Sequence, residues 1–533
     1  MRLAVLAHRP TSPVLRTLLF GLGLVALAAP PCRAAEEAVP PPEEVSREID
    51  RIFEAAWQKQ GVEPASPTDD ASFLRRLSLD LTGIIPEVGE VRAFLADPRP
   101  DKRARKVDEL LARPRHATHL ANQWREILLP RSIPESTSLA FQNWMQTRFR
   151  EGVAYDQFVR EILLTSGPLA NAPQGLYFAA LNSKPSELAA SSSRVFLGVQ
   201  IRCAECHDHP FTEWKQDDFW GYAAFFARVR GPSEMGGAAD VTDASSGEVR
   251  NPTTKKTVPP RFLGVAAAKM EAESKTEKGS AKLEPRRKQI VDWMTADGNP
   301  YFARAAANRV WSLLFGRGLV HPVDNLDENN PPSHPEVLNL LAADFARSHF
   351  DLQRMFRILA GTKVYQLASS PHAEPERLAD YAVMPVRSLS AKQVYDCLVQ
   401  ATGRRQPAAA DNGRVLEQRL EFLKQIEAPT REPTDFQGGI PQTLTMLNGP
   451  LVTELTSSWS SDLVAALEDS PFLSRDDRID TLYLATLTRL PDSRQRARIG
   501  EWVESHAQNG DATQPLSDLL WGLVNSSEFV LNR

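Results

Sequence analysis

Apolar residues recur at helical spacing along most of the chain. Between Phe73 and Leu81 four of them fall at i, i+1, i+4 and i+8, which puts them on one face of a helix, and Gly83 is typical of its end. The same spacing predicts short amphipathic helices over 91–95 and 107–111. The first half of the chain is therefore expected to be almost wholly helical.

Helix signals continue in the second half, with clear start and stop residues. Asn299, which a proline follows, is a typical helix cap, and Gly316 would end the same helix. The sequences at 333–336 and 390–393 match the capping box, in which each of two side chains accepts from the other residue's backbone N–H. These signals predict a second helical region.

The helical pattern is lost over 231–284. This stretch is polar, contains several Gly and Ser residues and lacks a period, which is typical of an extended connection. Within it, the turn at Asn251 predicts a small hairpin over 248–258. The chain thus divides into a helical domain over 43–230, this linker, and a second helical domain over 285–533. The predicted fold class is mainly α, with two helical domains joined by an irregular segment containing at most a small β-hairpin.

The first 34 residues (1–34) have the composition of a secretory signal peptide. Arg2 and Arg16 precede an apolar run from Leu18 to Ala29, and Ala34 completes a small-residue cleavage signal. The 12 residues of the apolar run are fewer than the roughly 20 that a membrane-spanning helix needs. We therefore expect export to the periplasm or the exterior, with no membrane span after cleavage.

Composition and charge exclude several classes of partner. The chain has 62 basic and 67 acidic residues, a net charge of -5, so it carries neither a nucleic-acid footprint nor an acidic tail. It contains no nucleotide-binding loop, no Gly-x-Ser-x-Gly elbow and no His-Glu-x-x-His motif. Nucleic acid is not an expected partner, and no familiar catalytic motif is present.

One short segment concentrates the chemistry of the chain. It reads Cys203-Ala-Glu-Cys206-His207, followed at once by Asp208 and His209, in a chain with only 4 Cys and 10 His. Cys-x-x-Cys-His is the attachment motif of c-type haem, in which the two thiols form thioethers and the histidine binds the iron. The motif predicts haem c on Cys203 and Cys206, with His207 as the axial ligand.

Other chemistries can use the same residues. Zinc or iron can be bound by the two thiolates with His207 or His209 as a third ligand and Asp208 in support, the fourth ligand coming from elsewhere. A short disulfide or dithiol is the plainest alternative. A metal-dependent hydrolase would use Asp208 and Glu213 as nearby carboxylates, but no base and nucleophile arrangement accompanies them.

Large aromatic residues follow the motif as far as Phe226. Such residues can wall a flat macrocycle and keep water from the iron. However, Phe219, Tyr222 and Phe226 fall at i, i+3 and i+7, a spacing that is equally typical of an ordinary helical core. Both interpretations stay open from the sequence.

Two histidines elsewhere, His116 and His119, share a helix face at i, i+3. This spacing can bind a metal ion, but no acid or thiol lies nearby in the sequence. Surface or packed histidines are the preferred interpretation.

A loop over 321–334 clusters Asp and Asn residues between two histidines. It can bind calcium or lend a ligand to the motif, although a solvated turn is the commoner outcome of such a composition. A second axial ligand for haem would come from His321, His334, Met235 or Met446, and spacing favours none of them.

The sequence also resembles a known family. FLGVQIRCAECHDHPFTEWKQDDFWGYAAFFARV is similar to the signature of a secreted family found mainly in planctomycete bacteria, the domain of unknown function numbered 1549. Its usual partner, the domain numbered 1553, is resembled by four stretches further on, NRVWSLLFGRGLVHPVDNLDENNPPSHPEVLNLLAADF, PVRSLSAKQVYDCLVQATG, PQTLTMLNGPLV and LLWGLVNSSEFVLNR. The resemblance implies an exported protein whose relatives often carry planctomycete-type cytochrome c domains.

Three functional hypotheses follow. The first is an exported c-type haem protein that acts in electron transfer or as the redox part of a cell-envelope system, with a redox or envelope protein as partner. The second is a non-redox protein in which Cys and His residues hold a structural metal ion and the helical domains bind a glycan or a partner protein. The third is the metal-dependent hydrolase.

Overall fold

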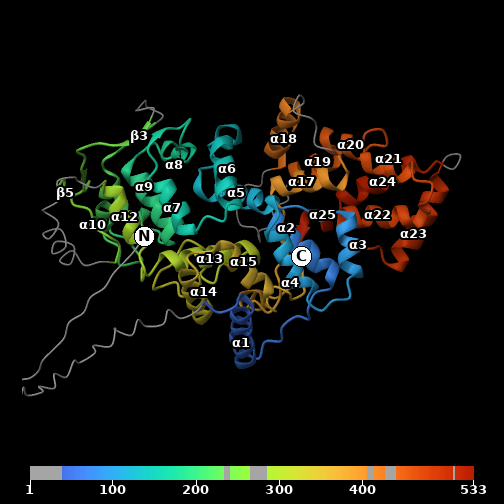
Figure 1. Cartoon of the computed structure of the whole chain (residues 1–533), viewed down its shortest axis with the longest axis horizontal. Coiled ribbons are helices and arrows are strands. Elements are labelled where there is room, and N and C mark those ends of the chain that lie inside the picture. Colours follow the sequence, from blue (N-terminus) through green and yellow to red (C-terminus); the bar gives the residue numbers. More distant parts are fainter. Residues whose placement is uncertain (1–38, 233–239, 265–284, 405–411, 427–439, 508–510) are drawn as a thin grey trace, which may run out of the picture. The chain divides into compact units, whose positions relative to one another are not determined.

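A run of short helices accounts for most of the protein (Figure 1). The computed structural model describes residues 39–232, 240–264, 285–404, 412–426, 440–507 and 511–533. The predicted signal peptide and Met235 lie outside these residues. Within the described residues, no helix is both long and apolar enough to span a membrane.

The helices confirm a mainly α fold. Up to residue 232 they are α1 (Pro42–Gln60), α2 (Asp70–Thr82), α3 (Val88–Ala96), α4 (Lys102–Leu111), α5 (Pro114–Leu128), α6 (Glu135–Arg150), α7 (Tyr155–Leu163), α8 (Leu176–Ala180), α9 (Pro185–Ser192) and α10 (Gln216–Ala223), with short helical turns η1 (Pro173–Gly175), η2 (Ser193–Leu197), η3 (Arg202–Glu205) and η4 (Ala224–Phe226). From residue 285 they are α12 (Arg286–Met294), α13 (Phe302–Phe315), α14 (Pro335–Arg347), α15 (Leu352–Gly361), α16 (Pro375–Ala379), α17 (Ala391–Ala401), α18 (Asn412–Ile426), α19 (Ile440–Asn448), α20 (Pro450–Thr456), α21 (Asp462–Glu468), α22 (Arg475–Leu487), α23 (Ser493–His506), α24 (Thr513–Val524) and α25 (Ser527–Val530).

Strands are few and short. They are β1 (Gly167–Pro168), β2 (Val229–Arg230), β3 (Asp240–Asp243), β4 (Val249–Arg250), β5 (Thr257–Val258), β6 (Arg387–Ser388) and β7 (Leu531–Asn532). They form an antiparallel sheet in the order β1-β3-β2 and two antiparallel pairs, β4-β5 and β6-β7. The hairpin predicted over 248–258 is the β4-β5 pair, and Asn251 shapes its turn by accepting from the backbone N–H groups of Thr253 and Thr254 at 2.8 and 2.9 Å.

The described part of 231–284 packs more closely than an extended connection would. Phe262 stacks between Phe225 and Trp293, at ring-centroid distances of 4.9 and 5.1 Å, and Leu263 is buried. Val241, in the middle strand of the three-stranded sheet, is also buried. A few isolated apolar side chains thus dock this segment on the helices, and a periodicity argument overlooks them because they follow no regular spacing.

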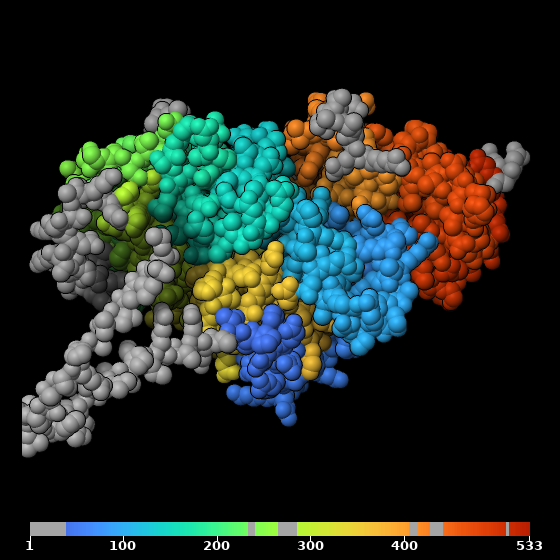
Figure 2. All heavy atoms as spheres, in the orientation of Figure 1, coloured from blue at the N-terminus to red at the C-terminus, as the bar shows by residue number. Residues whose placement is uncertain are grey.

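The buried side chains form two main clusters that do not divide the chain at 231–284. The larger cluster consists of residues from Val45 to Met384 together with Leu484, and therefore includes helices from both predicted domains. The smaller consists mainly of residues from Val394 onward. Contacts join all of Pro40–Arg533 into one compact unit. In Figure 2 the blue surface of the early helices borders the red C-terminal helices. One hydrogen bond between these parts joins Arg92 of α3 to Thr481 of α22, the arginine donating at 2.8 Å.

Helix α2 lies between the two clusters. Every residue from Phe73 to Thr82 is buried, because one side of the helix contributes Leu77 and Leu81 to the larger cluster while Leu79 faces the smaller. A helix that is buried on all sides must satisfy its terminal carbonyl groups with protein partners.

These partners explain the two histidines of α5. Side chains of α5 and α17, together with the amide of Gly83, bond the last four carbonyl groups of α2. Gly83 N and Gln393 Nε2 donate to Leu79 O, His119 to Asp80 O, His116 Nδ1 to Leu81 O and Arg115 Nε to Thr82 O. His116 and His119 are buried and cap a helix, and among the described residues no group of three or more His, Cys, Asp or Glu could hold a metal ion.

Two of the predicted helix starts are wrong, and the other helix signals are present. Ser390 and Gln393 form the expected capping box of α17, and Gly316 ends α13 in a left-handed conformation. Asn299 is not the N-cap of α13, because the helix starts at Phe302, two residues later than predicted, although the Asn299 side chain accepts from the N–H groups of Tyr301 and Phe302 at 3.0 Å. The capping box predicted at Ser333 is wrong, because α14 starts one residue later than the motif requires and the Ser333 hydroxyl donates to a loop carbonyl, Leu319 O, at 3.2 Å.

Candidate functional site

The Cys-x-x-Cys-His motif lies on the protein surface between η2 and α10. Gly198 ends η2 in a left-handed conformation, and the chain then enters the 3-10 turn η3, which contains Cys203. Cys203, Cys206 and His207 are exposed, whereas Ala204 between the thiols is fully buried. Both thiols are free of disulfides. Ala204 thus packs into the protein, and the two cysteines on either side of it face solvent.

Side chains of α10 hold the backbone of the motif by hydrogen bonds. Gln216 Nε2 donates to the carbonyl groups of Glu205 and Cys206, at 3.2 and 2.8 Å, and Trp220 Nε1 donates to the first of them at 3.0 Å. Because these donors come from a regular helix, the position of the motif backbone is defined although its side chains are exposed.

The imidazole of His207 has a defined tautomer. Its Nδ1 lies 2.7 Å from the carbonyl oxygen of Asp208. A carbonyl oxygen can only accept, so Nδ1 carries the proton and donates, and in the neutral ring the lone pair belongs to Nε2. His207 therefore offers Nε2 to a metal while a carbonyl group holds Nδ1, which is the usual arrangement of a metal-binding histidine.

His209 has the opposite arrangement. Its Nδ1 accepts from the backbone N–H groups of Phe211 and Thr212, both at 3.2 Å. In the neutral ring the proton is then on Nε2, so neither nitrogen has a lone pair free for a metal ion. In this conformation His209 shapes the turn after the motif and is not a ligand.

Asp208 anchors the start of α10. Its carboxylate accepts from the backbone N–H of Gln216 at 2.9 Å and lies 3.5 Å from Lys215 Nζ. The Gln216 N–H, with Lys215, holds the pKa of this exposed carboxyl below its usual value. Glu213 is exposed. The two carboxylates proposed for a hydrolase are thus one helix-anchoring group and one surface group.

The aromatic residues after the motif belong mostly to the core. Phe219, Tyr222 and Phe226 have no exposed surface, and the Tyr222 hydroxyl bonds Ser192 Oγ at 3.3 Å. The helical face that carries these three packs inward against α9, as the alternative of an ordinary helical core predicted. Phe211 is instead 81% exposed beside the motif.

The loop over 321–334 lies against the motif segment, as one hypothesis required. Leu326 N donates to Gly198 O at 2.8 Å, and Asn329 Nδ2 donates to Phe211 O at 2.9 Å. Both aspartates of the loop already have partners, since Asp324 pairs with two arginines and Asp327 accepts from the Asn329 N–H at 2.8 Å, while Glu328 is exposed. The loop is therefore a positioning element, and its geometry does not support a calcium site.

The residues considered as second axial ligands are dispersed. His334 is buried, its ring 4.4 Å from that of Phe53 and 5.8 Å from that of Tyr381, and burial lowers its pKa. Met446 is buried in the smaller cluster. His321 begins the loop that contacts the motif segment, and its buried Nδ1 has no hydrogen-bond partner among the residues that the structure describes.

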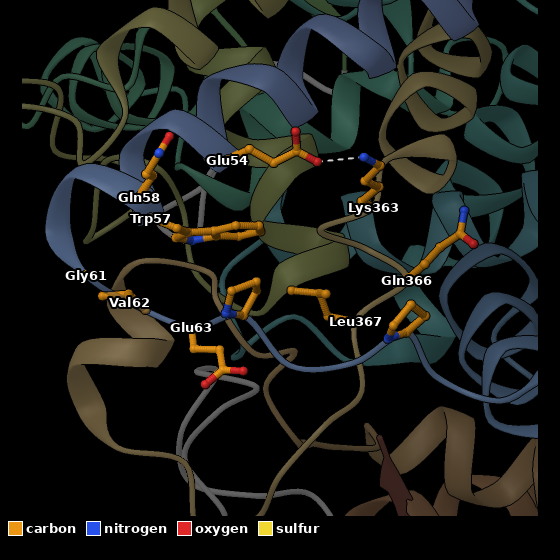
Figure 3. A pocket seen from close by; sticks show the side chains of 11 residues that line it. Glu54, Trp57, Gln58, Gly61, Val62, Glu63, Lys363, Gln366 and Leu367 are labelled. Carbon is orange, nitrogen blue, oxygen red and sulfur yellow. Dashed lines mark hydrogen bonds and ion pairs between the residues drawn. The ribbon is translucent and has the colours of Figure 1, made fainter.

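A pocket of about 660 Å³ lies apart from the motif (Figure 3). It is formed by the end of α1, the following segment to Pro67 and the turn after α15. Trp57 and Leu367 contribute apolar surface, and Glu54 and Lys363 form an ion pair of 2.6 Å at its rim. Sequence analysis did not identify this site, because its two halves are about 300 residues apart in the chain.

Comparison with known proteins identifies two family matches. Residues 48–231 match PSCyt2, described as a protein of unknown function (DUF1549), and residues 286–437 match PSD1, described as a protein of unknown function (DUF1553). The search of curated proteins finds no match, and neither does the search of solved structures. The matched stretches are separated by the segment from 232 to 285.

Proposed function

Since the chain belongs to the PSCyt2 family over residues 48–231 and to the PSD1 family over residues 286–437, we propose a function for the motif that the PSCyt2 segment carries. The protein is an exported c-type haem protein, with haem c attached to Cys203 and Cys206 and His207 as its axial ligand. It acts in electron transfer or as the redox component of a cell-envelope system.

The single observation that supports this proposal most is the joint exposure of the three motif side chains. Thioether formation needs two thiols that are free and accessible, and Cys203 and Cys206 are both. Axial ligation needs an imidazole with an unprotonated nitrogen, which His207 offers at Nε2 because the Asp208 carbonyl holds Nδ1.

The chain's own residues would keep the motif in place during a redox cycle. Gln216 and Trp220 bond the carbonyl groups of Glu205 and Cys206, and the Asp208 carboxylate bonds the Gln216 N–H. A backbone held at this many points reorganises little when the local charge changes. Haem c would supply a one-electron couple at this position.

Surface exposure also fits a role in exchange with a partner protein. The motif lies beside the exposed ring of Phe211, so a group attached there would be accessible to a second protein. Export through the predicted signal peptide would bring the chain to the compartment in which bacteria attach c-type haem.

The structural-metal hypothesis has less support in the described residues. His209 uses Nδ1 as a backbone acceptor, and the motif side chains do not converge on one point with a third and fourth ligand. The test below distinguishes a bound zinc ion from a disulfide between Cys203 and Cys206.

The test is a visible spectrum of the protein made in a host that supplies haem-attachment machinery. We expect a pyridine haemochrome spectrum of the c type that survives acid-acetone extraction and is lost in Cys203→Ser with Cys206→Ser. Cys397→Ser, which changes the buried thiol of α17, is the matched control and should keep the spectrum. Zinc in a near one-to-one ratio without a Soret band would favour the structural metal, and a colourless protein without titratable thiols would favour the disulfide.

A further inference from the structure

The pocket at the end of α1 has the dimensions of a ligand site. Its volume of about 660 Å³ falls within the roughly 300–1,000 Å³ typical of small-molecule sites. It shares no residue with the Cys-x-x-Cys-His motif, so it is independent of the haem proposal.

The walls of the pocket are apolar side chains on a paired backbone. Thr68 N donates to Gln366 O and Ala368 N donates to Ser66 O, both at 2.8 Å. The two segments that flank the pocket, 66–68 and 366–368, are therefore hydrogen-bonded to each other. Trp57 Nε1 donates to Asp380 O at 2.8 Å, which leaves only the ring carbons of Trp57 for the pocket. An incoming peptide would therefore find no free sheet edge and no indole N–H.

The rim carries polar groups that the protein itself does not use. The side chains of Gln58 and Glu63 are exposed and have no hydrogen-bond partner among the described residues. Gln366 uses its oxygen to accept from Arg103 at 3.0 Å, which leaves its amide N–H groups to face a ligand. The positive charge of Lys363 is already compensated by Glu54 at 2.6 Å. The rim thus offers acceptors and donors with little net charge.

We propose that this pocket binds a neutral saccharide. A pyranose ring has an apolar C–H face, which suits the exposed prolines Pro64 and Pro67 and the small parts of Trp57 and Leu367 that stay accessible, 5% of each residue. Its hydroxyl edges suit planar amide and carboxylate side chains. Figure 3 shows this arrangement, with the Trp57 ring below the Glu54–Lys363 pair and Gln58, Glu63 and Gln366 around it. Glu63 is the one carboxylate of the lining without a basic partner, so an organic cation is the alternative ligand that the experiment must distinguish.

The experiment uses the full-length protein on an array of neutral oligosaccharides built from glucose, galactose, mannose, xylose and N-acetylglucosamine. The best binder is then titrated calorimetrically into the wild type and into the double variant Gln58→Ala with Glu63→Ala. Both side chains are exposed, so the fold should be kept, and thermal unfolding verifies this. Gln60→Ala, an exposed amide on the same helix that does not line the pocket, is the matched control.

We expect the double variant to bind about tenfold more weakly, a loss of about 1.4 kcal/mol, and the control to match the wild type. Two results would overturn the proposal. One is that no neutral oligosaccharide is retained. The other is that the double variant binds the selected sugar as well as the wild type does. Binding of choline at the same residues, with no sugar bound, would reassign the pocket to an organic cation.

Discussion

Asn329 Nδ2 donates a hydrogen bond of 2.9 Å to the carbonyl oxygen of Phe211, 118 residues earlier in the chain. The first residue lies in the PSD1 segment and the second in the PSCyt2 segment, next to the exposed motif. Leu326 N reinforces the contact by donating to Gly198 O at 2.8 Å. The two matched segments therefore meet at the motif, and the second helps to position the first.

Gly198 gives a test of this contact. Its φ of +69° is unfavourable for other residues, and a Cβ atom would lie 2.7 Å from Leu326 Cδ1. Gly198→Ala should lower the free energy of unfolding by about 1–3 kcal/mol, measured by urea denaturation. Gly89→Ala in α3, where a Cβ meets open space, should leave stability unchanged or raise it by up to about 1 kcal/mol. Equal effects of the two substitutions would contradict the close packing of the loop on the motif segment.

A buried ion pair joins the two hydrophobic clusters. Asp80 accepts from Arg387 at 2.8 and 2.9 Å, from the Tyr365 hydroxyl at 2.8 Å and from Asn532 Nδ2 at 2.7 Å. Removing one partner leaves an uncompensated charge in the interior, so Arg387→Met should cost about 3–5 kcal/mol of unfolding free energy.

The matched control for that ion pair is on the surface. Arg99 pairs with Asp97 at 2.7 Å, but its side chain is 60% exposed. Solvent screens such a pair, so Arg99→Met should cost no more than about 1 kcal/mol in the same denaturation experiment. A small effect of Arg387→Met would show that the Asp80 network does not stabilise the junction of the clusters.

His119 makes stability depend on pH. Burial lowers its pKa to about 3, with smaller effects of His116 and Arg115, whereas an unfolded histidine titrates near 6.5. The unfolded chain then binds the proton more readily, so the stability from His119 is fully present above about pH 6.5 and is lost progressively as the pH falls toward 3. The expected slope is about 1.4 kcal/mol per pH unit below pH 6.

His119→Gln separates this contribution from that of other groups. Glutamine keeps a donor for the Asp80 carbonyl but does not titrate, so the variant should lose less stability than the wild type between pH 6 and 5 in urea denaturation. Asp50 acts in the opposite sense, because burial raises its pKa to about 6 and its folded-state protonation adds stability as the pH falls. Both proteins contain Asp50, so its effect cancels when their stabilities are compared over the same pH range. Identical slopes of unfolding free energy against pH for variant and wild type would contradict the assignment to His119.

Local signals in the sequence predicted local structure well. Gly83 and Gly316 end the helices that apolar spacing defines, Ser390 caps α17, and Asn251 forms the turn of the hairpin. Each of these depends on neighbours within a few residues, which a sequence displays directly.

The sequence did not reveal features that depend on residues far apart in the chain. His116 and His119 cap α2 because α5 packs across its end, and no pattern within α5 shows this. Phe219 and Tyr222 have the same helical spacing whether they line a cavity or the core, and only their packing against α9 distinguishes the two. The pocket beside Trp57 combines two distant segments in the same way.

The most direct measurement is the mass of the tryptic peptide that contains the motif. Trypsin cleaves after Arg202 and Lys215, so Cys203, Cys206 and His207 fall in one peptide. For protein made with haem-attachment machinery, the account predicts a peptide heavier than its sequence mass by one haem, with both thiols blocked to alkylation. A peptide that takes up two alkyl groups, or one that is lighter than its sequence mass by two hydrogens because of a disulfide, would contradict it.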